Sequence, residues 1–478
     1  MTFDHVETVG WIALAIMSVV LAFGSAGHAL LWKRDPRSTL GWIGISLTLP
    51  LFGALFYWSF GVNRVRRTAV KFVFTGKRLG SSGAFRAAPP AFPVDTGSDH
   101  LHELRVLADK VTRRPLLPGN AVRTLVNGEA AYPPMLEAIE SAKHSVHLST
   151  YIFDSDGAGR EFIRALDAAA LRGVSVRVII DALGEKYSWP RARTLFRGPV
   201  KVGRFLPLRR GLYMNLRTHR KVLVVDGSTG FTGGMNLGDR HMVTRVSRAG
   251  PVHDLHFEVR GPVVSDLQKV FLEDWYFCTR EMHDDERCFP HIPEVGEASA
   301  RVIDDGPDEP ARKLHWMILG ALNCATRKVR IMTPYFIPDR SLLAALGTAA
   351  LRGVQVQLLL PEKNNIPLMH WAARSYLWEL LPYGIEIRYQ PPPFVHSKLF
   401  LVDDLWSLIG SANLDPRSLR LNFELNVEVY DDATARALAA HFDESWARSR
   451  RVTMDELDSR GLASRLRDGA AKLLSPYL

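Results

Sequence analysis

The sequence predicts an α/β fold made of two similar halves, preceded by two hydrophobic N-terminal segments. Three observations support this prediction. From about Leu116 onward, apolar β-rich runs alternate with helical patterns. A helix–strand–helix–strand pattern occurs twice, and the first sixty residues contain two long uncharged runs. A chain of 478 residues is also too long for one compact core, so more than one structural unit is expected.

The two N-terminal runs, Val9 to Trp32 and Leu40 to Val62, predict transmembrane helices over about 9–32 and 40–62. Each could cross a hydrocarbon core of about 30 Å. Aromatic residues typical of the membrane interface mark their ends: Trp11, Trp32, Trp42, Tyr57 and Trp58. The acidic leader does not fit a cleaved signal peptide. Two buried core helices are an alternative, and Pro50 with four glycines would also suit a second run that lies in the interface.

Positive charge flanks both runs and predicts the orientation in the membrane. Three basic residues separate the runs: Lys33, Arg34 and Arg37. Six follow the second run: Arg64, Arg66, Arg67, Lys71, Lys77 and Arg78. The heavier cluster predicts that the large C-terminal part is cytoplasmic.

The charge and the cysteine content indicate which kinds of partner and ligand the chain could bind. The net charge of +10 favours a polyanion, either nucleic acid or an anionic bilayer, and the hydrophobic runs favour the bilayer. Cys278, Cys288 and Cys324 form neither a disulfide framework nor a metal-ligand spacing. We therefore expect no metal, no cofactor and no nucleic acid partner, and the oligomeric state stays open.

Composition also predicts the domain boundaries. Residues 1–78 form the membrane anchor, and 79–115 form a linker that is rich in Gly, Ser, Pro and Ala between Gly80 and Ser98. The two halves cover 116–298 and 299–450. Residues 451–478 read as a charged helical tail that lies on the catalytic body or on the bilayer.

An internal repeat predicts that the halves are related by a pseudo-two-fold axis. The segment from Leu136 to Ala182 resembles the segment from Leu319 to Glu362. The string Ala-Leu-Arg-Gly-Val occurs in both, at 170–174 and 350–354. Such an identity within matching patterns indicates two copies of one α/β unit.

Each half carries a His-x-Lys-x4-Asp motif followed by a Gly-[Gly/Ser]-x-Asn turn, and matching positions are 177 residues apart. The motif residues, which we take as the catalytic set, are His219, Lys221, Asp226, His396, Lys398 and Asp403. The turns end in Asn236 and Asn413, and the second turn contains Ser411. A single His-x-Lys pair would carry little information, but two complete blocks with identical spacing predict a shared site.

The spacing suits phosphoryl transfer. A His and a Lys two positions apart on a strand point to the same side, so a nucleophile or acid/base lies beside a cation. We expect Asn236, Asn413 and Ser411 to bind the phosphate. Val222 to Val225 and Leu399 to Val402 should be buried strands. Two halves meeting face to face would neutralise one phosphoryl group without a metal ion.

These blocks resemble the phospholipase D superfamily and, within it, the bacterial cardiolipin synthases. The resemblance covers nearly the whole chain, including ALFYWSFGVNR near the N-terminus and the C-terminal LLSPYL. It implies that one motif histidine forms a phosphatidyl-histidine while the other protonates the leaving alcohol and deprotonates the incoming one. It also implies that His219 is the nucleophile and His396 the acid/base. The symmetry of the motifs leaves this assignment open from the residues alone.

The same resemblance implies that Asp254 and Glu424 orient the histidines, since a catalytic histidine needs a carboxylate that selects its tautomer. The motif aspartates Asp226 and Asp403 look more like structural or network residues.

Four arginines, Arg209, Arg210, Arg217 and Arg220, could contact headgroups or form a solvated face. Core packing is favoured for Trp371, Tyr376 and Trp378, and packing or surface positions for the histidines His144, His147, His241 and His370.

The expected function is cardiolipin synthesis at a bacterial inner membrane, with phosphatidylglycerol as substrate and glycerol as by-product. A phospholipase D that uses water, or a transferase with another acceptor alcohol, is the alternative. A membrane-tethered nuclease is disfavoured by the hydrophobic runs, and a non-catalytic protein that binds anionic lipid is disfavoured by the intact motifs.

Overall fold

The computed structural model describes residues 3–33, 36–62, 99–206, 216–245, 250–283, 285–307 and 312–475. The chain forms two compact units, Met1–Lys71 and Phe72–Leu478, and each is described by itself. The predicted linker between Gly80 and Ser98 and the basic cluster from Arg64 to Arg78 lie outside the described residues.

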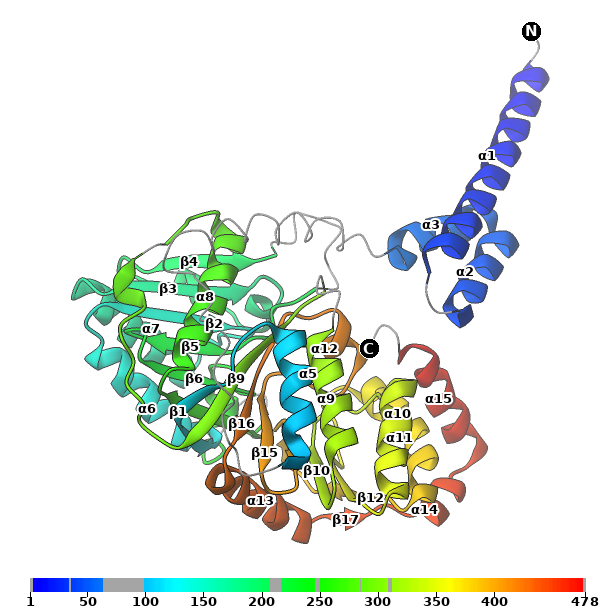
Figure 1. Cartoon of the computed structure of the whole chain (residues 1–478). Coiled ribbons are helices and arrows are strands. Elements are labelled where there is room, and N and C mark those ends of the chain that lie inside the picture. The colour runs from blue at the N-terminus through cyan, green and yellow to red at the C-terminus, as the bar shows by residue number, and fades with distance from the viewer. Residues whose placement is uncertain are drawn as a thin grey trace. The chain divides into compact units, whose positions relative to one another are not determined.

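The N-terminal unit is built on one long apolar helix, α1 (Phe3–Trp32), which Figure 1 shows in dark blue. Its segment Thr8–Trp32 is long and apolar enough to cross a membrane, by length and composition. Val9, Trp11, Ile16 and Val20 on its first half are each more than half exposed, as a lipid-facing helix requires. A helix of suitable length and composition is therefore present where the first spanning helix was predicted, over 9–32.

The second predicted spanning helix, over 40–62, is not confirmed. The run is divided into α2 (Pro36–Thr48), α3 (Pro50–Phe56) and a π-helical turn, η1 (Tyr57–Gly61). The helix breaks at Leu49, whose φ of −127° and ψ of 72° are not helical, directly before Pro50. The 13 residues of α2 reach about 20 Å, short of a bilayer core. Among the described residues, α1 is the one helix that meets the criteria for a span.

Small side chains allow α2 and α3 to pack closely on the C-terminal half of α1. The buried stripe of α1 consists of Ala22, Ser25, Ala26 and Ala29. Polar side chains join the elements at this end: Nδ1 of His28 lies 2.6 Å from the Tyr57 hydroxyl, and the Trp58 indole donates to Ser25 at 3.0 Å. Small-residue contacts and interhelical hydrogen bonds are the usual means of association for helices in lipid.

The second unit contains one mixed sheet of fifteen strands among its described residues, with a separate two-stranded pair. The strands of the first half are β1 (Leu117–Val126), β2 (Ser145–Thr150), β3 (Ser175–Asp181), β4 (Lys201–Phe205), β5 (Val222–Val225), β6 (Thr229–Gly233), β7 (Val252–His253) and β8 (Leu255–Arg260). Those of the second half are β9 (Ala298–Asp305), β10 (Lys328–Met332), β11 (Gln355–Pro361), β12 (Glu386–Gln390), β13 (Phe394–Val395), β14 (Leu399–Val402), β15 (Trp406–Gly410), β16 (Glu424–Tyr430) and β17 (Arg450–Arg451).

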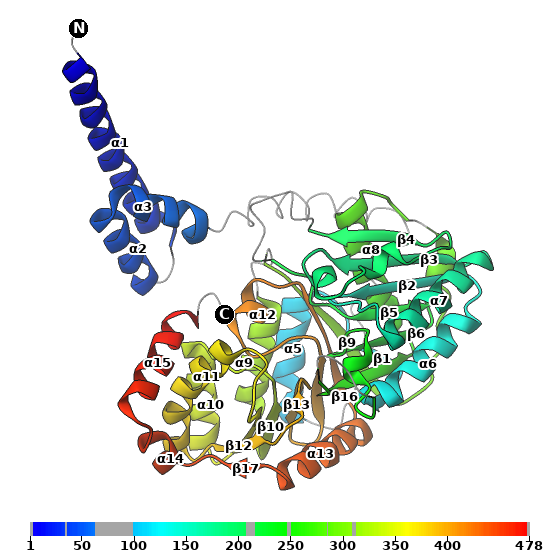
Figure 2. The same cartoon turned by 180° about the vertical axis from the view of Figure 1, so that it is seen from behind.

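The order of the strands shows the predicted pseudo-two-fold relation. From the antiparallel junction of β1 and β9, the sheet runs outward as β8-β6-β5-β2-β3-β4 on one side and as β16-β15-β14-β10-β11-β12 on the other. Figures 1 and 2 show the two halves meeting at this junction. The predicted buried strands, Val222–Val225 and Leu399–Val402, are β5 and β14, and all eight of their residues are buried.

Helices cover both faces of the sheet. α5 (His102–Thr112) precedes the first half, whose own helices are α6 (Asn127–Ser141), α7 (Gly157–Leu171) and α8 (Val264–Thr279). In the second half they are α9 (Lys313–Cys324), α10 (Arg340–Leu351), α11 (Pro367–Leu380), α12 (Pro416–Arg420), α13 (Asp432–Ala447), α14 (Met454–Asp458) and α15 (Leu462–Leu473). Although α5 precedes the first half of the sheet, it packs beside α9 (Figure 1).

The repeated Ala-Leu-Arg-Gly-Val string ends α7 and α10 in the same way. Gly173 and Gly353 adopt φ values of 91° and 89°, which end the helices and which a side chain would disfavour. The guanidinium groups of Arg172 and Arg352 donate to the last carbonyl groups of α6 and α9. Each Arg thus ties two helices together, which explains why these five residues occur in both halves.

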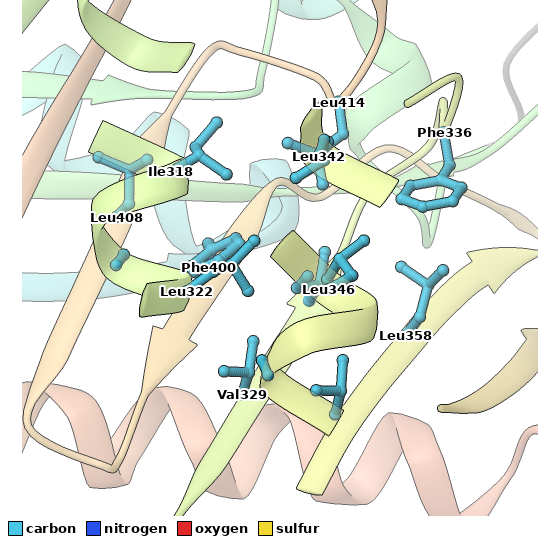
Figure 3. Close-up of a cluster of buried hydrophobic side chains, with 14 of the residues drawn as sticks. Ile318, Leu322, Val329, Phe336, Leu342, Leu346, Leu358, Phe400, Leu408 and Leu414 are labelled. Atoms are coloured by element: carbon cyan, nitrogen blue, oxygen red, sulfur yellow. The ribbon is translucent and has the colours of Figure 1, made fainter. Parts of the chain in front are cut away.

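The second half has its own apolar core between α9, α10 and the sheet, shown in Figure 3. Phe400 and Leu408 point from β14 and β15 toward Ile318, Leu322 and Leu346 of the helices (Figure 3). A further cluster combines residues of both halves, from α8, α13 and the central strands. This shared core stabilises the junction at which the motifs meet.

Candidate active site

Each motif histidine is anchored through its backbone to the opposite half. The His219 amide donates to the Phe423 carbonyl at 2.8 Å, and the His396 amide donates to the His253 carbonyl at 2.7 Å. The strand pair β7–β13 and the bridge between Thr218 and Phe423 support these contacts. The residues that follow these two carbonyl groups are Glu424 and Asp254, the acids that the resemblance singled out. The same short segment therefore supplies both the backbone anchor and the carboxylate for each histidine.

The two imidazole rings face each other across the junction and pair with carboxylates in a crossed arrangement. Nδ1 of His219 lies 3.0 Å from Glu424 in the second half, and Nδ1 of His396 lies 2.7 Å from Asp254 in the first. The ring centroids are 6.4 Å apart at an interplanar angle of 82°. When Nδ1 carries the proton and donates it to the carboxylate, Nε2 of each ring is available for chemistry.

Both motif lysines are buried beside their histidines. The Lys221 ammonium donates to the His219 carbonyl at 2.7 Å, and that of Lys398 donates to the His396 carbonyl. Burial lowers the pKa of Lys221 to about 7 and that of Lys398 to about 8, with Glu424 and Asp254 opposing the shift. Two buried cations next to two imidazoles form a site that an anion would stabilise.

The electrostatic environments of the two histidines differ. Burial lowers the pKa of His219, although Glu424 acts to raise it. Burial, together with Lys398, His219 and Lys221, holds the pKa of His396 well below its usual value. A bound phosphodiester anion would raise these pKa values and favour the protonated state that a general acid needs.

The carboxylates differ as well. Burial acts to raise the pKa of Glu424, but His219, Lys221 and Ser411 outweigh it and the pKa is lowered. The Asp254 pKa is raised by burial, with Lys398 opposing. Glu424 accepts hydrogen bonds from Ser411 at 2.6 Å and from the Asn422 amide at 3.1 Å, so it is the better supported anion.

The comparisons with known proteins agree with this geometry. A family model described as cardiolipin synthase, PLD-like domain, matches residues 135–275 and 318–446, and one described as phospholipase D-nuclease N-terminal matches residues 9–61. The chain belongs to the cardiolipin synthase family. It is 33% identical to a cardiolipin synthase of Geobacillus kaustophilus over 476 residues, which cover 97% of this chain and 94% of that relative.

Two further matches show how far the family likeness extends. A probable cardiolipin synthase of Bacillus subtilis is 31% identical over 475 residues, covering 97% of this chain and 93% of the relative. The crystal structure of a phosphatidylserine synthase from Haemophilus influenzae aligns with a TM-score of 0.62 and 16% identity, covering 79% of this chain and all of that one. The latter likeness shows the shared phospholipase D-like fold alone.

Asp226 and Asp403 lie outside the cluster of histidines and lysines in this member of the cardiolipin synthase family. They follow the far ends of β5 and β14, roughly 20 Å along an extended chain from the histidines. Asp226 accepts the amides of Lys143, His144 and Ser145, and Asp403 accepts those of Thr326, Arg327 and Lys328. These hydrogen bonds favour a structural role for both aspartates over the catalytic role predicted for them. They close the turns before β2 and β10, in line with the structural alternative.

The Gly-x-x-Asn turns hold the predicted phosphate ligands unequally. Oδ1 of Asn236 accepts the Ile152 amide at 3.1 Å, whereas Oδ1 of Asn413 is buried with no protein partner among the described residues. The Ser411 hydroxyl donates to Glu424, so the structure favours a role in holding this carboxylate over the predicted phosphate contact. At the matching position, a Cβ on Gly234 would overlap the carboxylate of Asp254.

The structure also places residues that the motif analysis did not single out. Tyr151 and Tyr335 lie against the two histidines, with ring centroids 5.6 Å from His219 and 6.3 Å from His396. Each follows the second strand of its half, and that shared position was a signal in the sequence. His241 is buried and accepts the Asn236 amide at 3.2 Å.

The predicted headgroup arginines divide into two groups. Arg220 is buried in an ion pair with Asp274 at 2.7 Å and donates to the Glu424 carbonyl, so it stabilises the fold and is not a solvated face. Arg217 is also buried. Arg209 and Arg210 lie outside the described residues.

The lysine pKa values predict how activity depends on pH. A lysine holds a phosphate only when protonated, and the protonated fraction falls as pH rises through a pKa of about 7 for Lys221 and about 8 for Lys398. We expect kcat/KM for phosphatidylglycerol to fall above about pH 8, approaching tenfold per pH unit for each lysine that loses its charge. Because a bound anion raises both pKa values, kcat should fall less. The measurement is initial rates in mixed micelles from pH 6 to 10.

Lys398→Arg is the control for this profile. Its guanidinium stays charged throughout the range, so whatever activity it retains should fall less steeply with pH. A wild-type kcat/KM that stays flat from pH 7 to 10 would contradict the assignment of both lysines to phosphate binding.

Proposed function

We propose that the chain is a phosphatidyltransferase that makes cardiolipin and glycerol from two molecules of phosphatidylglycerol. The observation that carries the proposal is a pair of histidine–carboxylate dyads in which each carboxylate comes from the other half of the chain. The ring centroids of His219 and His396 are 6.4 Å apart, and both motif lysines are buried beside the histidines. Membership in the cardiolipin synthase family supports the choice of lipid.

In the first step, Nε2 of His219 attacks the phosphorus of one phosphatidylglycerol. The bond from phosphorus to the glycerol oxygen breaks, and protonated His396 gives its Nε2 proton to the departing oxygen. The products are free glycerol, a phosphatidyl group on His219 and neutral His396. Lys221 and Lys398 stabilise the charge on the non-bridging oxygens.

In the second step, His396 takes the proton from a hydroxyl group of the second phosphatidylglycerol. The oxygen of that hydroxyl attacks phosphorus, and the bond between phosphorus and Nε2 of His219 breaks. Cardiolipin is released, and both histidines return to their starting protonation states. Transfer over hydrolysis requires that water be kept from the intermediate, and we assign this role to the tyrosine rings beside the histidines.

His219 is the proposed nucleophile because its dyad is better suited to a phosphorylated imidazole. That ring gains positive character, and Glu424 is an anion supported by Ser411 and Asn422. His396 pairs with Asp254, whose pKa is raised, and a lower pKa makes protonated His396 the stronger acid. This assignment agrees with the family resemblance. We assign orienting roles to Glu424 and Asp254 and phosphate contacts to Asn236 and Asn413.

We further propose that the chain is a multi-pass protein of a bacterial inner membrane, with the catalytic unit cytoplasmic and no nucleic acid partner. The apolar helix α1 supports insertion, and the charge cluster from Arg64 to Arg78 supports the orientation. The proposed boundaries are 1–78, 79–115, 116–298, 299–450 and 451–478. In this proposal the second run, broken at Pro50, crosses as a kinked segment.

Incubating the purified chain with phosphatidylglycerol alone tests the proposed reaction. We expect equal amounts of cardiolipin and glycerol, measured by thin-layer chromatography and an enzymatic glycerol assay. Phosphatidic acid without cardiolipin would contradict transfer and favour hydrolysis. His219→Ala and His396→Ala should each lower turnover by at least about a hundredfold.

The role of each histidine needs a second measurement. Lipid labelled in the acyl chain should stay covalently attached to wild-type protein after a denaturing quench at neutral pH, which leaves the acyl esters intact, and His219→Ala should show no such label. If His219→Ala kept the wild-type level of label on the protein, His396 would be the nucleophile and His219 the acid/base. His144→Gln is the control, because it alters an exposed histidine outside the proposed site.

Membrane topology can be tested in intact spheroplasts with a protease site inserted after Leu478. We expect protease added to intact spheroplasts to leave the site uncut and to cleave it only after lysis, because the catalytic unit is cytoplasmic. Cleavage in intact spheroplasts would reverse the proposed orientation.

A further inference from the structure

Outside the active site, one group of side chains among the described residues combines two imidazoles and a thiol. One possible ligand atom from each of His147, His283 and Cys288 lies within 4.8 Å of the others. Sγ of Cys288 is 3.4 Å from Nε2 of His283. The motif spacing of the sequence could not reveal this group, because His147 lies on β2 and the other two follow α8.

His147 has an unsatisfied nitrogen that points to a missing partner. Its ring is fully buried and stacks on Phe271, with centroids 4.8 Å apart. The Gln268 side-chain amide lies 2.7 Å from Nδ1 and holds the ring, while Nε2 is buried with no partner among the described residues. With its oxygen turned toward the ring, the amide would accept a proton from Nδ1 and leave the lone pair of Nε2 for a ligand. A buried polar atom without a hydrogen-bond partner destabilises the fold. The His283 ring faces His147 edge-on, with centroids 5.6 Å apart.

The distances are close to those of a zinc-type site. Bonds of about 2.0–2.1 Å to nitrogen and 2.3 Å to sulfur place the ligand atoms of a tetrahedral ion roughly 3.3–3.6 Å apart. The pair formed by Cys288 and His283 already meets this spacing. The widest separation, 4.8 Å, would have to close by roughly 1 Å. His283 and Cys288 can supply this movement, because between α8 and β9 the described chain holds no helix longer than a single turn.

We propose that His147, His283 and Cys288 bind a thiophilic cation of the Zn²⁺ class, with water completing the coordination. Cys288 would bind as the thiolate, and its proton would pass to solvent. Arg177 is the nearby cation that opposes binding, but it pairs with Glu281 at 3.1 Å. The ion would fasten the segment that connects the two halves onto β2. Its role is structural, so phosphoryl transfer without a metal is unaffected.

Cobalt substitution tests this site in the full chain. Detergent-purified protein is stripped with a chelator and titrated with Co²⁺. We expect one equivalent to produce a near-ultraviolet thiolate-to-cobalt band, which Zn²⁺ abolishes by displacement. Cys288→Ser should lose the band and His147→Gln should weaken binding. Cys278→Ser should retain it, because Cys278 lies on α8 outside the group.

Cardiolipin synthesis by each variant serves as the check on folding, since none of these residues belongs to the proposed dyads. Wild-type protein that synthesises cardiolipin but shows no thiolate band overturns the metal site, as does a loss of the band in Cys278→Ser equal to that in Cys288→Ser. In that case the Cys288 thiol simply donates to His283. Loss of synthesis with the band intact would instead count against the proposed function.

A second and independent feature is an exposed leucine face on α15. Leu462, Leu466 and Leu473 are 71%, 65% and 79% exposed, and their spacing of four and seven residues places them on one side of the helix. The other side packs on α11, where Lys472 donates to Glu379 at 2.8 Å and Asp468 is buried (Figure 1). The helix is therefore held by one face and presents an apolar face outward.

The margins of this leucine face carry the side chains of a membrane interface. Trp378 of α11 is 51% exposed, so the core packing predicted for it is wrong, and the Lys472 ammonium lies 5.9 Å from its ring. Arg465 is exposed on the same helix. Leucines bordered by an indole and cations match the surface of an anionic bilayer. A bilayer is at hand because the same chain carries the apolar helix α1.

We infer that the leucine face of α15 lies in the headgroup region of an anionic bilayer. The test places a photo-crosslinking amino acid at position 466 or 473 of the full chain in vesicles of labelled phosphatidylglycerol. Leu351, which is 72% exposed at the end of α10, is the matched control. We expect lipid label at positions 466 and 473 several times above that at 351. Equal labelling at all three positions would overturn the inference, whatever the catalytic activity.

Discussion

Each motif histidine depends on the opposite half of the chain for both its backbone position and its carboxylate. The Phe423 and His253 carbonyls hold the backbones of His219 and His396, and the next residues, Glu424 and Asp254, hold their rings. A shift between the halves would therefore move the backbone anchor and the acid together. Neither half contains a complete dyad, so the junction of β1 and β9 and the shared core beneath it are requirements for the site.

The same crossing makes it possible to bury two lysines. Lys221 and Lys398 are almost fully enclosed, and burial alone would favour their neutral forms. Glu424 and Asp254 offset part of this cost, and a phosphodiester anion would supply the remainder. The free site therefore holds positive charge that is only partly balanced. In our proposal this charge is the binding energy for the substrate and the stabilisation of the transition state.

Departures from the pseudo-two-fold relation distinguish the halves chemically. Ser411 supports the Glu424 carboxylate, whereas Gly234 occupies the matching position because Asp254 fills the space of a side chain. Asp254 and Glu424 differ in side-chain length and in hydrogen-bond partners. The pKa of Asp254 is raised and that of Glu424 is lowered. Two motifs of identical sequence pattern can in this way perform different steps of one reaction.

The sequence by itself determined the features that depend on neighbouring residues. These are the two α/β repeats, the buried strands β5 and β14, and the helix ends formed by Ala-Leu-Arg-Gly-Val, where Gly173 and Gly353 adopt the φ that the turn requires. Family resemblance added the acids Asp254 and Glu424, but the sequence could not show that each serves the histidine of the other half. Only the tertiary structure decided that crossing, the withdrawal of Asp226 and Asp403 from the site, the break at Pro50 and the meeting of His147 with Cys288. Apart from the break, which follows from the backbone restriction on the residue before Pro50, these features arise from contacts between segments far apart in the chain, and local sequence patterns carry no record of such contacts.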